Sequence, residues 1–150
     1  MPGWLLDTNV VLRIQEERCD QYELVTRAVA ELVSGGFPVC VAPQIIAEFW
    51  AAATRPKDVN GLGWETSLAE ARAEVLLNKF EFLEDTPSVF PIWLDLVRTH
   101  AVKGKQVHDA RLVAVVKAHA VENLLTFNVD DFKTYQEINA VHPASVVQGS

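Results

Sequence analysis

The chain has 150 residues, 49% of them hydrophobic and 22% charged, which fits one globular domain spanning residues 1–150. Its net charge of −7 argues against indiscriminate binding to nucleic acid, because such affinity comes largely from Lys and Arg contacts to phosphates. No run approaches the roughly 18 apolar residues of a membrane helix and no basic, signal-like segment opens the chain, so we expect a soluble cytoplasmic protein without membrane association.

The first half of the chain alternates short apolar runs with helical patterns. Turn-forming and helix-capping residues separate these segments. In chain order the pattern predicts a strand at 4–6, a helix after residue 7, a second helix capped by Asp20 and ending near residue 33, a strand at 37–41 and a helix opened by Pro43.

The second half continues the same alternation. It predicts a loop at 55–63, helices at about 64–80, 88–101 and 107–120, a brief strand at 82–83, a strand at 123–126 and an edge strand at 138–141. Parallel strands need crossover helices, so this order predicts an α/β fold. We expect a three-layer α/β/α sandwich with a central, mainly parallel sheet.

Asp109 is the most informative single residue of the sequence. At about 3.6 residues per turn it shares a helix face with Leu112, Val113 and Val116. A charged residue therefore stands at the N-terminal end of an apolar helix face. Burying an isolated carboxylate is costly, which predicts a partner such as a metal ion, a cation or the free amides of the helix start. The alternative is an acid stabilised by the helix dipole alone.

Asp7 and Glu48 each allow a functional and a purely structural interpretation. Asp7 ends the first strand before Thr8 and Asn9, whose side chains can orient its carboxylate or bond the turn backbone. It is a candidate ligand or a simple helix N-cap. Glu48 flanks the apolar face of its helix and is a candidate ligand or a boundary residue with its carboxylate in water.

A polar turn follows the strand at 123–126. There Asn128, Asp130 and Asp131 can all reach the sheet edge, and any of them can instead cap the turn. His108 adjoins Asp109 without an HxxxH or Cys/His spacing, so zinc chemistry is not expected. Four basic residues in the late helix region are either phosphate contacts or a solvated basic face: Lys103, Lys105, Arg111 and Lys117.

Four acidic motifs in this order, LLDTN at 5–9, QIIAEFW at 44–50, HDARL at 108–112 and LLTFNVDDF at 124–132, resemble a PIN domain. Among PIN domains the chain resembles the VapC-type ribonuclease toxins over nearly its whole length. The resemblance implies that Asp7, Glu48 and Asp109 are the first three acids of the family site. Thr8, Asn9 and Thr126 are its expected supporting residues.

The fourth acidic position departs from the family pattern. Asn128 stands there, with Asp131 just beyond it. An amide oxygen can bind Mg²⁺ or hold a metal-bound water but adds no charge. We therefore keep both residues as candidates to complete the site.

By resemblance the protein is a Mg²⁺- or Mn²⁺-dependent endoribonuclease, since hard carboxylate oxygens suit these ions. We hypothesise that Asp7 and Asp109, with Glu48, hold an ion that lowers the pKa of a bound water. Glu48 would orient or deprotonate that water. A second ion near Asn128 or Asp131, about 4 Å from the first, would stabilise the leaving oxygen.

The resemblance also implies partners: an RNA substrate, a second copy in a homodimer, and a cognate antitoxin of a type II toxin–antitoxin pair. Two other functions stay open. One is a catalytically weak or inactive PIN-like binding module, which Asn128 favours and for which Trp50, Trp64 and Trp93 offer a surface, although aromatic residues at helical positions are more often core. The other is a metal-dependent DNA nuclease or phosphatase.

Overall fold

The computed structural model describes residues 2–149 and contains in that range a five-stranded parallel sheet. Its strand order is β3-β2-β1-β4-β5, with every neighbouring pair parallel. The strands are short, as expected for a small crossover sheet: β1 (Gly3–Leu6), β2 (Val39–Val41), β3 (Glu81–Phe82), β4 (Glu122–Leu125) and β5 (Asn139–Val141).

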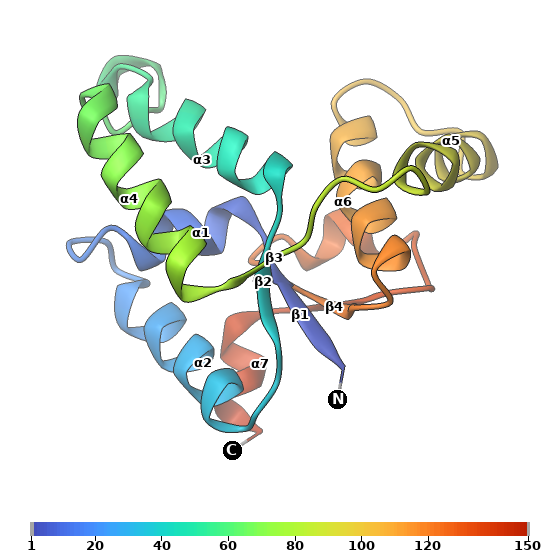
Figure 1. Ribbon diagram of the computed structural model, residues 1–150, viewed down its shortest axis with the longest axis horizontal. Helices are drawn as coiled ribbons and strands as arrows, with labels where there is room; N and C mark the ends of the chain where they lie inside the picture. The colour runs from blue at the N-terminus through green and yellow to red at the C-terminus, as the bar shows by residue number, and fades with distance from the viewer. Residues whose placement is uncertain (1, 150) are drawn as a thin grey trace.

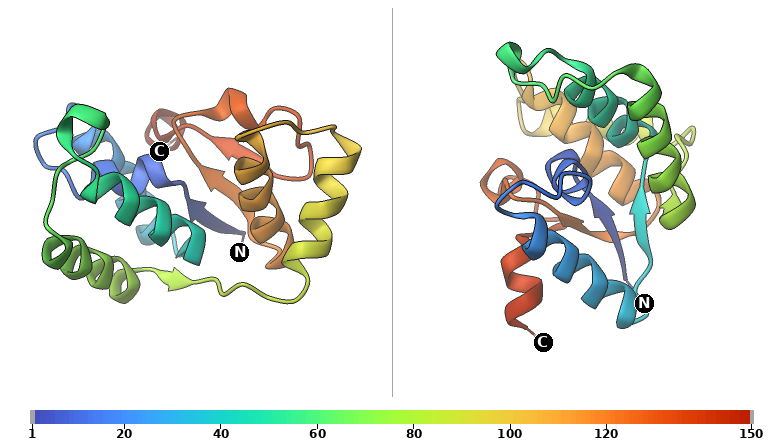
Figure 2. Two further views of the ribbon diagram at one scale, coloured as in Figure 1. Left: turned by 90° about the horizontal axis from the view of Figure 1, so that it is seen from above. Right: turned by 90° about the vertical axis from the view of Figure 1, so that its left-hand side faces the viewer.

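Helices cover both faces of the sheet. Figures 1 and 2 show α2 and α7 packed together on one side and α5 and α6 together on the other, while α3 packs against α1 and α4. This arrangement confirms the predicted three-layer α/β/α sandwich. The helices are α1 (Thr8–Ile14), α2 (Tyr22–Ser34), α3 (Pro43–Thr54), α4 (Thr66–Lys79), α5 (Val89–Thr99), α6 (Gln106–Ala118) and α7 (Pro143–Gln148), with 3-10 turns η1 (Lys57–Val59) and η2 (Val129–Phe132).

The core explains why the strands read as continuous apolar runs. Leu5 and Leu6 of β1 and Leu124 and Leu125 of β4 are all fully buried, although neighbouring side chains point to opposite faces. A parallel sheet covered by helices on both faces requires this pattern. Cys40 is buried in the adjacent strand β2 as a free thiol.

The structure corrects some boundaries. Asp20 does not cap the second helix: α2 begins at Tyr22, its N-cap is Gln21, and no side-chain cap bond is made. The chain turns through residues 17–21 before the helix starts, so Asp20 lies outside it. Helix α7 was not expected, because its six residues are too short for a clear helical period. Proline at its first position and the His142 ring, which accepts a bond from Ala144 N, start it.

Helix α6 also differs from the predicted one-sided stripe. Leu112 through Val116 are five consecutive buried residues, so α6 is buried on nearly every side. The cause is that α6 contacts both α5 and β4. The three tryptophans Trp50, Trp64 and Trp93 are partly buried against the core, which is the more common role predicted for them. No helix within residues 2–149 is long and apolar enough to cross a membrane.

The strand order reverses direction at β1. The chain moves from β1 to β2 on one side and later returns to β4 on the other. Such a switch point leaves a crevice at the carboxyl ends of the two strands, where open α/β sheets bind ligands. Asp7 directly follows β1 and Thr126 directly follows β4, so both lie at this crevice.

Candidate metal-type site at the sheet edge

Asp7 is the N-cap of α1 and a buried residue of the sheet edge at the same time. Its Oδ1 accepts a hydrogen bond from Thr8 N at 2.7 Å, and its own N–H donates to Leu125 O at 3.0 Å. Only 7% of the residue is exposed. The predicted capping role is therefore real, but a cap alone does not require so buried a carboxylate.

The second oxygen of Asp7 is held by side chains from both strand ends. Thr126 Oγ1 donates to Asp7 Oδ2 at 2.8 Å, and Asn9 Nδ2 approaches the same oxygen at 3.3 Å. Thr126 Oγ1 in turn accepts from Asn128 N at 3.0 Å, and Asn9 Oδ1 accepts from Phe127 N at 3.2 Å. This network fixes the turn after β4 against the start of α1.

Burial raises the pKa of Asp7, and the negative charge of Glu48 acts in the same direction. The hydrogen bonds from Thr126, Thr8 and Asn9 lower the pKa but do not cancel the effect of burial. The Asp7 carboxylate thus accepts several hydrogen bonds, and a positive charge beside it would lower its raised pKa.

Asp109 likewise has a raised pKa. It lies in the first turn of α6, and its pKa rises from 3.8 to about 6, first through burial and then through the charges of Asp7, Asp131 and Glu48. His108 acts in the opposite direction. The position at a helix start therefore does not by itself compensate for the surrounding acids.

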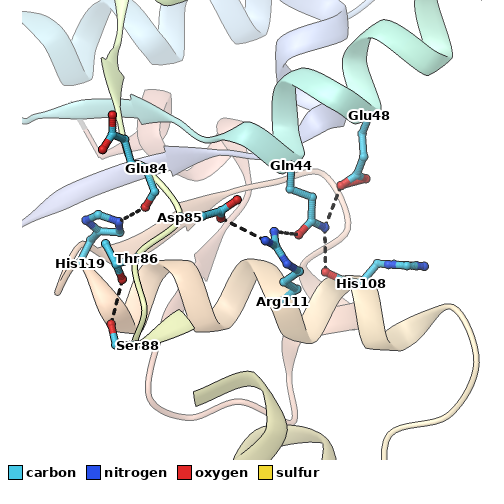
Figure 3. Close-up of polar contacts among 9 residues, drawn as sticks. All are labelled: Gln44, Glu48, Glu84, Asp85, Thr86, Ser88, His108, Arg111 and His119. Carbon is cyan, nitrogen blue, oxygen red and sulfur yellow. Dashed lines mark hydrogen bonds and ion pairs between the residues drawn. The ribbon is translucent and has the colours of Figure 1, made fainter. Parts of the chain in front are cut away.

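Glu48 is held by a chain of contacts that joins α3 to α6. Gln44 Nε2 donates to Glu48 Oε1 and to the His108 carbonyl, both at 2.9 Å. Arg111 Nη1 donates to Gln44 Oε1 at 3.0 Å, and its Nη2 pairs with Asp85 Oδ1 at 3.1 Å. Figure 3 shows the amide of Gln44 between Glu48 and Arg111, with the His108 ring directed away from the contacts.

These side chains surround one cavity of about 350 Å³ at the sheet edge. Most of the residues predicted for the site line it: Asp7, Thr8, Asn9, Glu48, Asp109 and Asn128. Asp131 instead lines a neighbouring cavity of about 700 Å³, and Asn128 lies on the border of both. Thr126 is fully buried behind Asp7 and orients it.

The predicted group of basic residues does not line this cavity. Of the four, Arg111 pairs with Asp85 and Lys117 pairs with Glu137 at 3.7 Å, so nearby acids engage both. The cation that does line the cavity is Arg55, at the end of α3.

Two residues around Glu48, Gln44 and Arg55, are not among the site residues predicted from the sequence. A usable signal was present: Gln44 precedes Glu48 by four positions and Arg55 follows it by seven, which places all three on one face of α3. The sequence predicts for Arg111 either a phosphate contact or a place on a solvated basic face. Its bonds across to α3 depend on tertiary packing.

The lining fits a divalent cation in chemical type. Carboxylate, amide and hydroxyl oxygens face the cavity, and Mg²⁺ and Mn²⁺ prefer such ligands. The Thr8 hydroxyl is also buried there without a hydrogen-bond partner in residues 2–149. In the same part of the chain no three Asp, Glu, His or Cys side chains are placed to share one ion as they stand. Mg²⁺ commonly takes one or two carboxylates and keeps waters, so pairs of these acids match its needs.

The fold and the site together define an α/β protein with an acidic, oxygen-rich site at the switch point of a parallel sheet. The chain belongs to the PIN domain family, whose model matches residues 4–138. This finding confirms the family that the four acidic motifs predicted.

Known relatives agree with this assignment. Ribonuclease VapC24 from Mycobacterium tuberculosis is 24% identical over 131 residues, which are 87% of this chain and 89% of that protein. A chain of the VapBC2 complex from Rickettsia felis, bound to promoter DNA, has a TM-score of 0.69 at 15% identity, covering 93% of this chain and 97% of its own. The sarcin-ricin loop cleaving toxin VapC20 from Mycobacterium tuberculosis has a TM-score of 0.64 at 18% identity, covering 89% and 95%. The two structures share the fold of this chain.

Proposed function

We propose that this protein is a Mg²⁺- or Mn²⁺-dependent endoribonuclease that acts as the toxin of a type II toxin–antitoxin pair, and that residues 1–150 form a single PIN-like domain. The observation that supports this most is the cavity shared by Asp7, Glu48, Asp109 and Asn128, in which the pKa of both aspartates is raised. Similarity to ribonucleases of the VapC type supports RNA as the substrate.

We assign the cation site to the acids Asp7, Glu48 and Asp109, two of which would hold the ion directly while water completes its coordination. When bound, a divalent ion supplies Lewis-acid activation of water and neutralises charge on the phosphate. Thr126 and Asn9 keep the Asp7 carboxylate oriented into the cavity. Thr8 contributes its unpartnered hydroxyl.

Glu48 is our candidate to accept the proton of the attacking water. Gln44 donates to one of its two carboxylate oxygens. Arg55, on the same cavity, is placed to contact the scissile phosphate. Asn128 supplies a neutral amide oxygen at the cavity, while Asp131 acts on Asp109 through its charge. Both remain candidates to complete the catalytic set.

Two partners belong to this proposal. An antitoxin is supported by the structural similarity to toxin–antitoxin complexes such as VapBC2. A basic side chain from such a partner would relieve the repulsion among Asp7, Glu48 and Asp109, which explains how it could block the site. A homodimer is proposed from the family resemblance.

The test compares wild-type protein with Asp7→Asn, purified in parallel, on an RNA pool with Mg²⁺, Mn²⁺ or EDTA. Asp95→Asn, at an exposed position of α5, is the matched control. We expect metal-dependent cleavage by the wild type and the control, lost in Asp7→Asn without loss of fold by circular dichroism. Retained cleavage in Asp7→Asn would refute the site assignment.

A parallel substrate panel separates the competing functions. DNA and small phosphoesters incubated under the same conditions test the DNA nuclease and phosphatase alternatives. If the protein is instead an inactive binding module, an alternative that the neutral Asn128 favours, none of the three proteins should cleave any substrate.

A further inference from the structure

A second cavity lies beside the acidic one, on the far side of Gln44 and Arg111. Its volume is about 430 Å³, and it is lined by Asp85, Thr86, Val89, Phe90, Trp93 and Arg111. Figure 3 shows Asp85 and Thr86 on the segment that leads into α5, with Arg111 reaching up from α6 toward Asp85. We call this cavity the aromatic pocket.

Two aromatic residues of α5 line the aromatic pocket. The Phe90 and Trp93 rings have centroids 5.8 Å apart with their planes tilted by 32°. Phe90 is 63% exposed, which is unusual for a side chain whose removal from water is favourable. An exposed, large aromatic residue at the rim of a pocket favours a role in binding over a role in the core.

Hydrogen bonds connect the aromatic pocket to the proposed active site in two places. Arg111 donates to Gln44, which donates to Glu48. On the opposite wall, Trp93 Nε1 donates to Val107 O at 2.8 Å, two positions before Asp109. The pocket is therefore linked to Glu48 through Arg111 and Gln44, and to the start of the helix that carries Asp109 through Trp93.

The charged residues of the pocket indicate whether it binds a phosphate group or a neutral ring of a ligand. Arg111 and Asp85 neutralise each other at 3.1 Å, and their side chains are still 36% and 44% exposed. A phosphate would meet the Asp85 carboxylate, which repels it. A neutral planar ring with hydrogen-bond donors along its edge instead finds acceptors in Asp85 and Thr86 and a stacking face in Phe90. Unpaired RNA bases are recognised by this combination of stacking and edge contacts.

We propose that the aromatic pocket binds an unpaired base of the RNA substrate, next to the nucleotide at which the chain is cut. The base stacks on Phe90 and places its polar edge against Asp85 and Thr86. This inference rests on the proposed ribonuclease function. A protein partner could instead place an apolar side chain against the aromatic rings. Such a partner would not depend on RNA bases, so comparing RNA with and without bases distinguishes the two occupants.

The experiment measures binding of short single-stranded RNA by fluorescence anisotropy, in an Asp7→Asn background that prevents cleavage. Homopolymers of A, U and C are compared with an abasic ribose-phosphate oligomer of equal length. Phe90→Ala is the test variant. Phe82→Ala is the matched control, because Phe82 is also an exposed phenylalanine, at 43%, but does not line the pocket.

We expect Phe90→Ala to weaken binding of the best base-bearing oligomer about tenfold, equivalent to about 1.4 kcal/mol and within the range of one stacked base. Binding of the abasic oligomer should not change, and Phe82→Ala should match the parent on both. The proposal is overturned by equal losses on both kinds of oligomer, by no loss, or by a change in oligomeric state of Phe90→Ala in light scattering, which would make Phe90 an interface residue.

A cleavage assay on the RNA pool with Asp7 intact keeps this proposal separate from the nuclease function. If the wild-type protein cuts RNA while Phe90→Ala changes no binding, only the aromatic pocket is refuted. If the wild-type protein cuts no RNA, the nuclease function fails whatever the binding data show.

Discussion

Asp109 carries the clearest physical consequence at the scale of single residues. Its pKa of about 6 means that the folded protein holds the Asp109 proton more tightly than the unfolded chain, whose Asp109 ionises near 3.8. The unfolded chain therefore loses its proton first as the pH rises. Stability falls between about pH 4 and pH 6, and the full loss is present above pH 6.

Asp109→Asn removes this ionisation. We expect the variant to melt at a higher temperature than the wild type in EDTA above pH 6, because it carries no charge to repel Asp7, Asp131 and Glu48. The difference should shrink as the pH approaches 4, where the wild-type carboxyl is protonated. Thermal melts across this pH range provide the measurement. A variant no more stable than wild type at pH 8 would contradict the electrostatic account.

At the same scale, Asp7 shows why single residues were hard to interpret from sequence. The two interpretations of Asp7, cap and ligand, are compatible, because one carboxylate oxygen caps α1 while the other meets Thr126 and Asn9. A local sequence pattern detects the cap. The partner Thr126 is separated from Asp7 by 119 positions and comes close only when β4 pairs with β1.

Helices α3 and α6 are coupled through one side chain at the scale of elements. Gln44 is on α3, and it bonds Glu48 on its own helix, the His108 carbonyl of α6 and Arg111 of α6. The amide uses both its donor and its acceptor side, which specifies its orientation. Gln44 is therefore a positioning residue for Glu48 in the proposed site.

Gln44→Met keeps the length of the side chain and removes every one of these bonds. We expect kcat for RNA cleavage to fall about tenfold with little change in KM, because each hydrogen bond to a charged group contributes about 1.5–3 kcal/mol. Gln148→Met, on α7 across the sheet, is the control and should retain full activity. Equal kcat in the two variants would show that Glu48 needs no orientation by Gln44.

The elements themselves were largely predictable, and the exceptions have local causes. Alternating apolar runs and helical periods indicated the parallel sheet and its crossover helices. The burial of α6 was not visible, since the polar side chains of His108, Arg111 and Lys117 lie among apolar residues and only the contacts with β4 and α5 show that the helix is covered. The start of α2 was misplaced because Asp20 has the right chemistry for a cap and the wrong position.

For the whole molecule, the acidic cavity links metal binding to stability. Any ligand that binds only the folded state stabilises it by mass action, by about 2.7 kcal/mol at a free concentration of 100 Kd. The carboxylates around the cavity repel one another, so a cation should relieve that repulsion as well. The effect is global, because binding to the folded state shifts the folding equilibrium of the whole domain.

We expect Mg²⁺ or Mn²⁺ to raise the melting temperature of the wild type relative to EDTA, by about 2–4 °C for each kcal/mol of stabilisation. Asp109→Ala should lose this rise, and Asp95→Ala, which alters an exposed acid of α5, should keep it. Differential scanning calorimetry at fixed ionic strength provides the measurement. An identical metal response in Asp109→Ala would place the cation elsewhere.

The sequence by itself determined the class of fold and the family, and it predicted three acids that line one cavity, Asp7, Glu48 and Asp109. Strand and helix periods are local properties, and LLDTN and HDARL place Asp7 and Asp109 at element ends, where a sheet edge was expected. Most of the predicted residues do line one cavity, with Thr126 supporting Asp7 from behind and Asp131 acting from the neighbouring cavity.

Only the tertiary structure decided how these side chains are held and what surrounds them. The bond from Arg111 to Gln44 crosses 67 positions, and the contact of Gln44 with His108 crosses 64. The raised pKa of Asp109 likewise depends on charges from three other parts of the chain. The distances between such segments arise from the packing of helices on the sheet. No local sequence pattern encodes them, because burial and the interaction between charges are properties of the assembled fold.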